Sequence, residues 1–335
     1  MRLGGPARYL VEVTTKDEVK QALDWAAQAE GLPIIMIGDG SNIVWRDEGY
    51  PGLVIVNKIT GIEQNDFDEN TAYFKLAAGE NWDNAIAHIT SKGFGGIGLL
   101  SLIPGTCGAA PVQNIGAYGA QLSDFLVTIE AFDTQEKRLT ILQASDCNFG
   151  YRTSKFKTTD KNRYFITEVT VMVSKDSAAN TTYHSLEGYL QAQNIHERSP
   201  AIIRDAVIAV RSSKLPDPAN VANCGSFFQN PIITPTHLQD IKSNNPKLAN
   251  WPSIYTWELP DGNIKIAAGA ILEHEGFKGY HDQETGMATW DTQALVLVNE
   301  SANSTAQLLA FKQKIVDHIK NRFNITLEQE PELLP

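Results

Sequence analysis

The chain has 335 residues, with 28 Lys and Arg against 39 Asp and Glu, so its formal net charge is −11. Hydrophobic residues make up 42% and charged residues 20%, which is typical of a globular protein with about two or three domains and excludes disorder as the dominant state. The acidic balance argues against nucleic acid as a partner, since such binding needs Lys and Arg concentrated on one face. The three cysteines show no metal-ligand or disulfide spacing, and no apolar run reaches the length of a membrane span. We therefore expect a cytoplasmic protein without a metal, and a monomer.

The first half of the chain predicts alternating strands and helices. Thr15 and Glu18 form a capping box that opens a helix, and Gly31 ends it. The apolar run 33–37 that follows suits a buried strand. The other elements expected here are a strand at 9–13, a helix at 82–92, and strands at 125–132 and 163–173.

The second half begins with a polar stretch, 174–198, which we interpret as a loop or linker. Ser199 with Pro200, and Thr234 with Pro235, are start signals of two helices. The remaining elements expected are a buried strand at 293–299 and an amphipathic helix at 304–323, opened by a capping box.

Residues 93–98 match the dinucleotide fingerprint GxGxxG letter by letter. That fingerprint binds a pyrophosphate only when it follows a strand and opens a helix, and here it follows an expected helix. We interpret it as a helix-to-strand connection. The run 38–42 (GDGSN) is better placed, directly after an expected strand, and on its own it fits a phosphate-binding turn and a simple tight turn equally well.

Residues 103–119 (IPGTCGAAPVQNIGAYG) have no charged side chain and few large ones. Such a segment contributes little to a core, but it lets a flat ligand lie against backbone N–H groups. A surface loop normally carries more charge. We therefore favour ligand binding over packing for this segment.

Six motifs in one order give the chain a resemblance to a known family. The motifs are 38–42, 78–82 (AGENW), 103–119, 149–154 (FGYRTS), 214–218 (KLPDP) and 225–228 (GSFF) followed by Asn230 and Pro231. Together they resemble the UDP-N-acetylenolpyruvoylglucosamine reductases, in the branch that closes a tyrosine-bearing loop over the substrate. The resemblance implies an α+β fold: an FAD-binding fold of the vanillyl-alcohol-oxidase type with a C-terminal substrate-binding α+β lobe. It also implies FAD as cofactor, NADPH as co-substrate, and reduction of a UDP-sugar enolpyruvyl ether in peptidoglycan precursor synthesis.

The resemblance also assigns roles to residues. FAD contacts fall on Gly38, Gly40, Ser41, Asn42, Ala109, Gln113, Asn114, Gly116, Ala117 and Tyr118. Catalysis falls on Arg152, Ser226 and Glu330. Substrate contacts fall on Tyr183, Lys214, Asn230 and Gln293.

The reaction needs these residue types. Hydride addition to an enol ether leaves negative charge on the neighbouring carbon and carboxylate, which a cation such as Arg152 stabilises. That carbon must then be protonated, and a positioned hydroxyl such as that of Ser226 can donate because the intermediate is strongly basic. Glu330 would help to stabilise the enol. A substrate diphosphate suits a cation such as Lys214 and an amide such as Asn230.

We expect two FAD-binding lobes at 1–67 and 68–200, a substrate-binding domain at 201–320, and a C-terminal segment, 321–335, that returns to the active site. Two alternatives remain open. One is an FAD-dependent alcohol oxidase or dehydrogenase of the same fold, and the other is a nucleotide-sugar-binding flavoprotein without catalytic activity. The first has no use for the motifs 225–228 and 214–218, and the three intact catalytic positions argue against the second.

Overall fold

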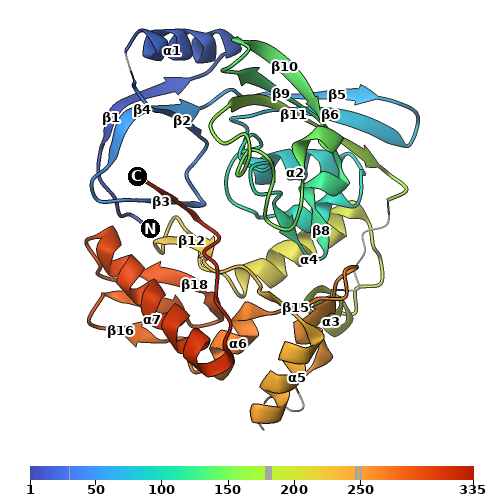
Figure 1. The fold of residues 1–335 in the computed structure, drawn as a ribbon. Helices are drawn as coiled ribbons and strands as arrows, with labels where there is room; N and C mark the ends of the chain where they lie inside the picture. Colours follow the sequence, from blue (N-terminus) through green and yellow to red (C-terminus); the bar gives the residue numbers. More distant parts are fainter. Residues whose placement is uncertain (30, 178–182, 246–247, 249–250) are drawn as a thin grey trace. The chain divides into compact units, whose positions relative to one another are not determined.

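The computed structural model describes residues 1–335 except 30, 178–182, 246–247 and 249–250. The described chain forms two compact units (Figure 1). Unit 1 comprises Met1–Pro6, Asn42–Gly49 and Ser212–Pro335, and unit 2 comprises Ala7–Ser41 and Tyr50–Arg211. The division of unit 2 into two FAD-binding lobes stays a prediction.

The first sheet of unit 2 is parallel and has the order β1-β4-β2. Its strands are β1 (Ala7–Val13), β4 (Tyr50–Asn57) and β2 (Ile34–Ile37). Helix α1 (Lys16–Gln28) covers it, and the predicted capping box of Thr15 and Glu18 is present. The core here includes Val19, Leu23 and Ile55. Helix α1 ends a few residues before Gly31, where the sequence placed its end.

The second sheet of unit 2 is antiparallel and has the order β10-β9-β11-β6-β5. Its strands are β5 (Ile62–Asp66), β6 (Thr71–Ala77), β9 (Leu126–Asp133), β10 (Arg138–Gln143) and β11 (Tyr164–Ser174). Helix α2 (Trp82–Ser91) packs Trp82 and Ile86 into the same core as Phe74 of β6. The strands expected near 125–132 and 163–173 and the helix at 82–92 are confirmed within one or two residues.

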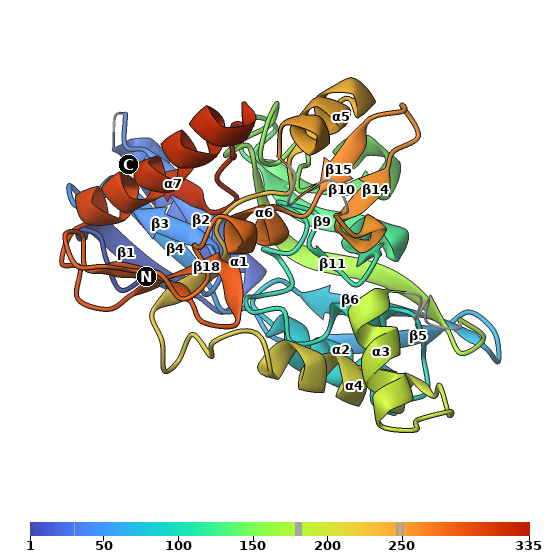
Figure 2. The ribbon, with the colours of Figure 1, turned by 90° about the horizontal axis from the view of Figure 1, so that it is seen from below.

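The expectation of a loop over 174–198 is wrong for part of its length, because helix α3 (His184–Ala192) lies within it. Its Leu186 and Leu190 are buried in one cluster with Ile203 and Val207 of α4 (Pro200–Ser212), and Figure 2 shows the two helices beside each other. Two apolar residues one turn apart were too weak a signal within a polar stretch. Residues 178–182 of this stretch lie outside the described residues.

The GxGxxG run does not open a helix after a strand. It follows α2, as expected, but the interpretation as a helix-to-strand connection is wrong at its far end, because the run leads into a 3₁₀ turn, η1 (Ile97–Leu100), and not into a strand. The other short elements of unit 2 are β7 (Gly116–Ala117), β8 (Ala120–Gln121), η2 (Leu122–Asp124) and η3 (Ala144–Cys147).

Unit 1 contains sheets of order β12-β18-β17-β16 and β13-β15-β14, and a pair β19-β3. The strands are β3 (Ile43–Trp45), β12 (Asn223–Ser226), β13 (Ile232–Ile233), β14 (Thr256–Glu258), β15 (Ile264–Ile266), β16 (His281–Asp282), β17 (Met287–Trp290), β18 (Gln293–Asn299) and β19 (Glu332–Leu334). The helices are α5 (Pro235–Asn244), α6 (Ala268–His274), α7 (Thr305–Phe323) and the 3₁₀ turn η5 (Ser253–Tyr255). Helix α7 buries Leu308, Phe311 and Ile315, which confirms the amphipathic helix expected at 304–323.

Among the described residues, no helix combines the length and apolar character that crossing a membrane requires. Nor do three His, Cys, Asp or Glu side chains come together there as metal ligands would.

Candidate functional site

The turn after β2 lies directly against the segment that begins the small-residue run 103–119. The Ser41 Oγ donates a hydrogen bond to the carbonyl oxygen of Pro104 (3.1 Å). A Cβ on Gly38 would lie 2.2 Å from the Thr106 Oγ1, so only glycine permits this approach. The two glycine-rich motifs therefore form one structure, which we call the cradle (38–41 and 104–109).

A third motif, 78–82, forms backbone hydrogen bonds with the second segment of the cradle. The Cys107 amide donates to the carbonyl of Glu80 (2.9 Å), and the Gly108 amide donates to the carbonyl of Ala78 (2.8 Å). The Trp82 amide donates to the carbonyl of Gly105 (3.0 Å), at the first turn of α2. Motifs that are far apart in the sequence thus meet at one place in unit 2.

The cradle has the chemistry that a dinucleotide cofactor needs. The Thr106 Oγ1 is buried and has no hydrogen-bond partner within the described part of the chain, so it is a hydroxyl ready for a ligand. At Gly40 (φ 69°), and at Gly119 (φ 86°) beyond the cradle, a Cβ would meet no atom within 4 Å, so there is open space beside the backbone. Backbone amides, a free hydroxyl and small side chains fit a diphosphate and a flat ring, and so they fit FAD. Thr106 was missed in the sequence because one hydroxyl among small residues carries no signal.

The end of the run 103–119 is fastened to the turn that carries Arg152. Asn114 is buried, has a left-handed backbone (φ 48°), and donates from its Nδ2 to the carbonyl of Gly150 (3.1 Å). The Arg152 Nη2 donates to the carbonyl of Gly116 (2.8 Å). The predicted FAD contacts and the predicted catalytic arginine are therefore neighbours. Gln113, Ala109 and Ala117 lie in the same run.

Two tyrosines, Tyr118 of the run 103–119 and Tyr183, pack against each other. The rings of Tyr118 and Tyr183 meet edge to face with centroids 5.4 Å apart, and Tyr183 immediately precedes α3. Burial raises the pKa of Tyr118 to about 12, although the charge of Arg211 opposes the shift. The phenol therefore stays protonated and available as a donor at neutral pH.

Arg211, at the end of α4, is a further cation of this region that the sequence did not single out. Burial lowers its pKa, and the charge of Arg152 lowers it further, whereas Tyr118 and Asp83 raise it. Its buried Nε has no hydrogen-bond partner among the residues the structure describes. Most arginines in a sequence are surface residues, so only the tertiary structure could identify this one.

Unit 1 brings the C-terminal tail to the Gly-Ser-Phe-Phe motif. Ser226 ends β12 and pairs with Val296 of β18. The Glu330 amide donates to the carbonyl of Phe227 (2.9 Å), and the Gln229 amide donates to the carbonyl of Glu328 (2.9 Å). Glu330, which is 9% exposed, therefore lies alongside the chain that carries Ser226.

The three substrate residues of unit 1 are linked through α6 and β18. The Asn230 Oδ1 accepts a hydrogen bond from the Ala268 amide at the start of α6 (3.0 Å). A Cβ on Gly269 would lie 2.8 Å from the Oε1 of Gln293, the first residue of β18. Lys214 is exposed, and its carbonyl accepts from the Thr292 Oγ1 (2.7 Å).

The predicted site residues thus fall into two groups. Arg152, Tyr183 and the FAD contacts other than Asn42 belong to unit 2, whereas Asn42, Ser226, Glu330, Lys214, Asn230 and Gln293 belong to unit 1. The carbonyl of Asn42 accepts a hydrogen bond from the amide of Glu332, which places it at the pair β3-β19. The roles of all these residues stay predictions.

Two family models match the chain. Residues 7–141 match a model described as FAD binding domain. Residues 217–334 match a model described as UDP-N-acetylenolpyruvoylglucosamine reductase, C-terminal domain. The two matches follow one another along the chain in the order expected for the two parts of the fold, the FAD-binding part first and the C-terminal part second.

Curated relatives match over almost the whole chain. Proteins of Ralstonia nicotianae and Cupriavidus pinatubonensis are each 38% identical, over 98% of this chain and 94% of theirs. A protein of Alcanivorax borkumensis is 38% identical over 99% of this chain and 93% of its own. All three are named UDP-N-acetylenolpyruvoylglucosamine reductase.

Among solved structures, the reductase of that name from Thermus caldophilus has a TM-score of 0.64 and 19% identity, over 97% of this chain and 92% of that one. At this identity the likeness concerns the fold. Together with the two family models, it confirms the expected fold class, an FAD-binding domain followed by a C-terminal α+β domain.

Proposed function

This chain belongs to the UDP-N-acetylenolpyruvoylglucosamine reductase family, as its six motifs predicted, and we propose that it reduces UDP-N-acetylglucosamine enolpyruvate to UDP-N-acetylmuramate with NADPH. It is an FAD-dependent oxidoreductase. The observation that carries the proposal is that the FAD-binding half and the family-specific C-terminal half occur in one chain, at 38% identity along nearly all of its length. The proposed reaction is a step of peptidoglycan precursor synthesis.

The cofactor would lie in the cradle. FAD, when bound, supplies a hydride that it takes from NADPH and passes to the methylene carbon of the enol ether. We assign the diphosphate of FAD to the backbone amides around Gly38 and Gly40 and to the hydroxyls of Ser41 and Thr106. We assign its ring to the stretch 113–118, which contains the predicted FAD contacts from Gln113 to Tyr118.

Arg152 would stabilise the negative charge that hydride addition leaves on the substrate. Its guanidinium is held by the carbonyl of Gly116 and lies 5.4 Å from the ring of Tyr151, so it is fixed before substrate binds. A fixed cation stabilises developing charge without the cost of reorganisation. The nearby charge of Arg211 adds to the positive potential of this part of unit 2.

Ser226 would donate the proton to carbon. A serine hydroxyl is a weak acid, but the enol intermediate is basic enough to take its proton. Glu330, on the strand-like tail that pairs with Phe227 and Gln229, would stabilise the enol. Both residues belong to unit 1, and their assignment follows from the family motif together with this local pairing.

The nucleotide-sugar would be bound by the four residues that the family motifs assign to it. Lys214 and Asn230 would hold its diphosphate, Gln293 would bind nearby at the start of β18, and Tyr183 would close over it. NADPH also carries a diphosphate, so the same groups could bind each in turn. This would give a ping-pong reaction, in which NADPH leaves before the second substrate binds.

We also propose that the protein acts as a monomer in the cytoplasm, where NADPH is regenerated, and that it binds no nucleic acid. The net charge of −11 supports the last point, since a phosphate backbone is repelled by an acidic protein.

An anaerobic spectroscopic titration tests the proposal. The purified protein, loaded with FAD, is titrated with NADPH and then with the enolpyruvyl substrate. We expect the flavin absorbance to bleach and then to recover with one equivalent of the substrate. Bleaching by an alcohol, which would be oxidised to a carbonyl compound, and recovery with O₂ but not with the enolpyruvyl ether would favour the alternative oxidase. Binding of the UDP-sugar without recovery would favour the inactive binding protein.

A further inference from the structure

Three hydrogen bonds join the turn that carries Arg152 to the run 112–116 beside it. The Asn114 Nδ2 donates to the carbonyl of Gly150 (3.1 Å), and the Arg152 Nη2 donates to the carbonyl of Gly116 (2.8 Å). The third runs from the Ser154 Oγ to the carbonyl of Val112 (2.6 Å). The first two involve predicted FAD or catalytic residues, whereas Ser154 has no assigned role.

The backbone of Arg152 needs such support. Its φ is 54°, in the left-handed region that a side chain with a Cβ rarely adopts. The turn is closed by two hydrogen bonds between Gly150 and Thr153, of 3.1 Å and 3.4 Å. A strained conformation of this kind persists only where the surrounding structure fixes it. The residue that follows the turn is therefore a natural place for an anchor.

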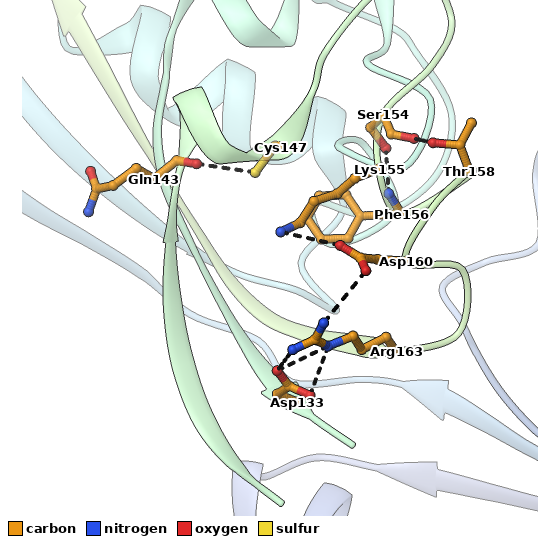
Figure 3. Close-up of polar contacts among 9 residues, drawn as sticks. All are labelled: Asp133, Gln143, Cys147, Ser154, Lys155, Phe156, Thr158, Asp160 and Arg163. Atoms are coloured by element: carbon orange, nitrogen blue, oxygen red, sulfur yellow. Dashed lines mark hydrogen bonds and ion pairs between the residues drawn. The ribbon is translucent and has the colours of Figure 1, made fainter. Parts of the chain in front are cut away.

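Ser154 has the geometry of that anchor. It is 0% exposed, and its hydroxyl both donates to Val112 and accepts from the Phe156 amide (3.2 Å). Its carbonyl accepts from the Thr158 Oγ1 (2.8 Å). Figure 3 shows the hydrogen bonds of Ser154 with Phe156 and with Thr158, which belong to its own segment. Both hydrogen-bonding functions of the hydroxyl are thus used, in a place where water cannot replace a lost partner.

The other side of the segment is fixed to the sheet by charges, also drawn in Figure 3. The Lys155 Nζ lies 3.5 Å from the Asp160 carboxylate, and Asp160 lies 3.7 Å from Arg163, which binds Asp133 on β9. Ser154 therefore joins a firmly held segment to the cofactor-binding run. Among the described side chains of residues 153–156, only that of Ser154 forms a hydrogen bond to this run.

We propose that Ser154 is a positioning residue: its hydrogen bond to Val112 holds the Arg152 turn at a fixed place relative to the cofactor-binding run. This inference rests on the proposed role of Arg152. A catalytic group that is displaced from its productive position loses much of its effect. Loss of the Ser154 hydrogen bond should therefore slow the step in which Arg152 acts, the reduction of the substrate. It should matter little for the reduction of FAD by NADPH, in which Arg152 has no proposed part.

The test compares Ser154→Ala with a matched control, Thr158→Ala, in the FAD-loaded enzyme. Ser154→Ala removes the two hydrogen bonds of the Ser154 hydroxyl, to Val112 and from the Phe156 amide. Thr158→Ala removes only the bond to the Ser154 carbonyl and so leaves Val112 held. For Ser154→Ala we expect reoxidation by the enolpyruvyl substrate to slow about 10- to 100-fold, while reduction by NADPH changes by less than about twofold. Thr158→Ala should change neither half-reaction by more than about twofold.

A double-mutant cycle separates positioning from general loosening of the fold. In an Arg152→Ala background, Ser154→Ala should slow reoxidation by less than about twofold more, because the group that it positions is gone. Full additivity of the two losses would overturn the proposal. So would an equal slowing of both half-reactions, or no slowing at all.

Hydrogen exchange provides a readout that does not depend on the reaction. The amides of 150–153 should exchange faster in Ser154→Ala than in the unmodified enzyme, and Thr158→Ala should leave them unchanged. If the unmodified enzyme fails to turn over the enolpyruvyl substrate, the proposed function fails, but this exchange pattern still decides whether Ser154 holds the turn. Ser154→Cys keeps the volume with a weaker donor and serves if Ser154→Ala does not fold. If neither variant folds with FAD, Ser154 is a folding residue and the positioning role is rejected.

Discussion

Asn114, Tyr118 and Arg152 all have a left-handed backbone, with φ of 48°, 52° and 54°. Each such residue costs free energy relative to an extended one, and a cluster of them marks a place where function outweighs local stability. All three belong to predicted FAD or catalytic positions in unit 2. The side chains of Asn114 and Arg152 make hydrogen bonds that maintain the arrangement.

The proton donor can be tested at the level of one residue. Ser226→Ala should leave bleaching by NADPH nearly intact, because hydride transfer to the flavin needs no proton from this side chain. Reoxidation by the enolpyruvyl substrate should slow at least about 100-fold, the low end for a positioned general acid. Anaerobic stopped-flow measures each half. Ser226→Cys should be milder, since a thiol still donates, and equal slowing of both halves would show that Ser226 is a binding or structural residue instead.

The close approach of Gly38 to Thr106 gives a second prediction at this scale. Gly38→Ala places a methyl group 2.2 Å from the Thr106 Oγ1, so we expect a loss of about 1–3 kcal/mol in the free energy of unfolding of the apoprotein. Adding Thr106→Ala removes the clashing hydroxyl and methyl and should recover part of that loss. Urea unfolding of the apoprotein measures both. Gly38→Ala that unfolds at the same urea concentration as the unmodified protein would contradict this account of the cradle.

At the scale of elements, sequence signals worked where they were local. The capping boxes at Thr15 and Ser304 predicted two helix starts because each box satisfies backbone groups within one turn. Helix α3 was missed because the burial of Leu186 and Leu190 depends on the distant helix α4. The same limit applies to the site. The glycine-rich runs indicated the cradle. The burial of Arg211, in contrast, depends on residues that are close to it in space but distant in the sequence.

The contact between β9 and the segment after Arg152 gives a prediction about pH. Arg163 donates to both carboxylate oxygens of Asp133 and lowers the pKa of that carboxyl to about 2. A lowered pKa stabilises the fold above the unfolded-state value near 4, and this stabilisation is lost as the pH falls through about 2. Asp133→Asn should therefore cost about 1–2 kcal/mol at pH 7, and the difference from the unmodified protein should shrink below about pH 4.

Unfolding of the apoprotein in urea at several pH values measures this difference. Asp24 offers a matched control, because its ion pair with Lys20 is exposed on α1. Asp24→Asn should change the free energy of unfolding by less than about 1 kcal/mol at each pH. A difference for Asp133→Asn that stays constant from pH 7 to pH 3 would contradict the role of its charge.

At the scale of the whole molecule, unit 1 is assembled from three segments of the chain. The short segments Met1–Pro6 and Asn42–Gly49 join the long C-terminal segment, and β3 from one of them pairs with β19 at the end of the chain. Segments of six and eight residues are too short to show a shift in composition, so the sequence could not indicate that they belong to unit 1. Parallel pairing between such distant strands is also non-local, and no local signal reports it.

The pair β3-β19 gives the last prediction. Ending the chain after Pro331 keeps Glu330 but removes β19, including Leu334, which is 3% exposed. It also removes the hydrogen bond that the Arg46 amide donates to the carbonyl of Leu334 (3.0 Å). We expect the free energy of unfolding of unit 1 to fall by about 2–4 kcal/mol, from lost apolar burial and two or more backbone hydrogen bonds.

Hydrogen exchange followed by peptide mass analysis can assign that loss to one unit. Amides of β3 and of the tail beside Phe227 should lose protection, whereas those of β9 and β11 in unit 2 should keep theirs, because each unit has its own core. Leu334→Ala is the control: it removes the side chain but keeps the strand pairing, so it should reproduce only the apolar part of the cost. If the truncation lowered protection equally in both units, the protein would unfold as one cooperative body, and the pair β3-β19 would stabilise the whole of it rather than closing unit 1.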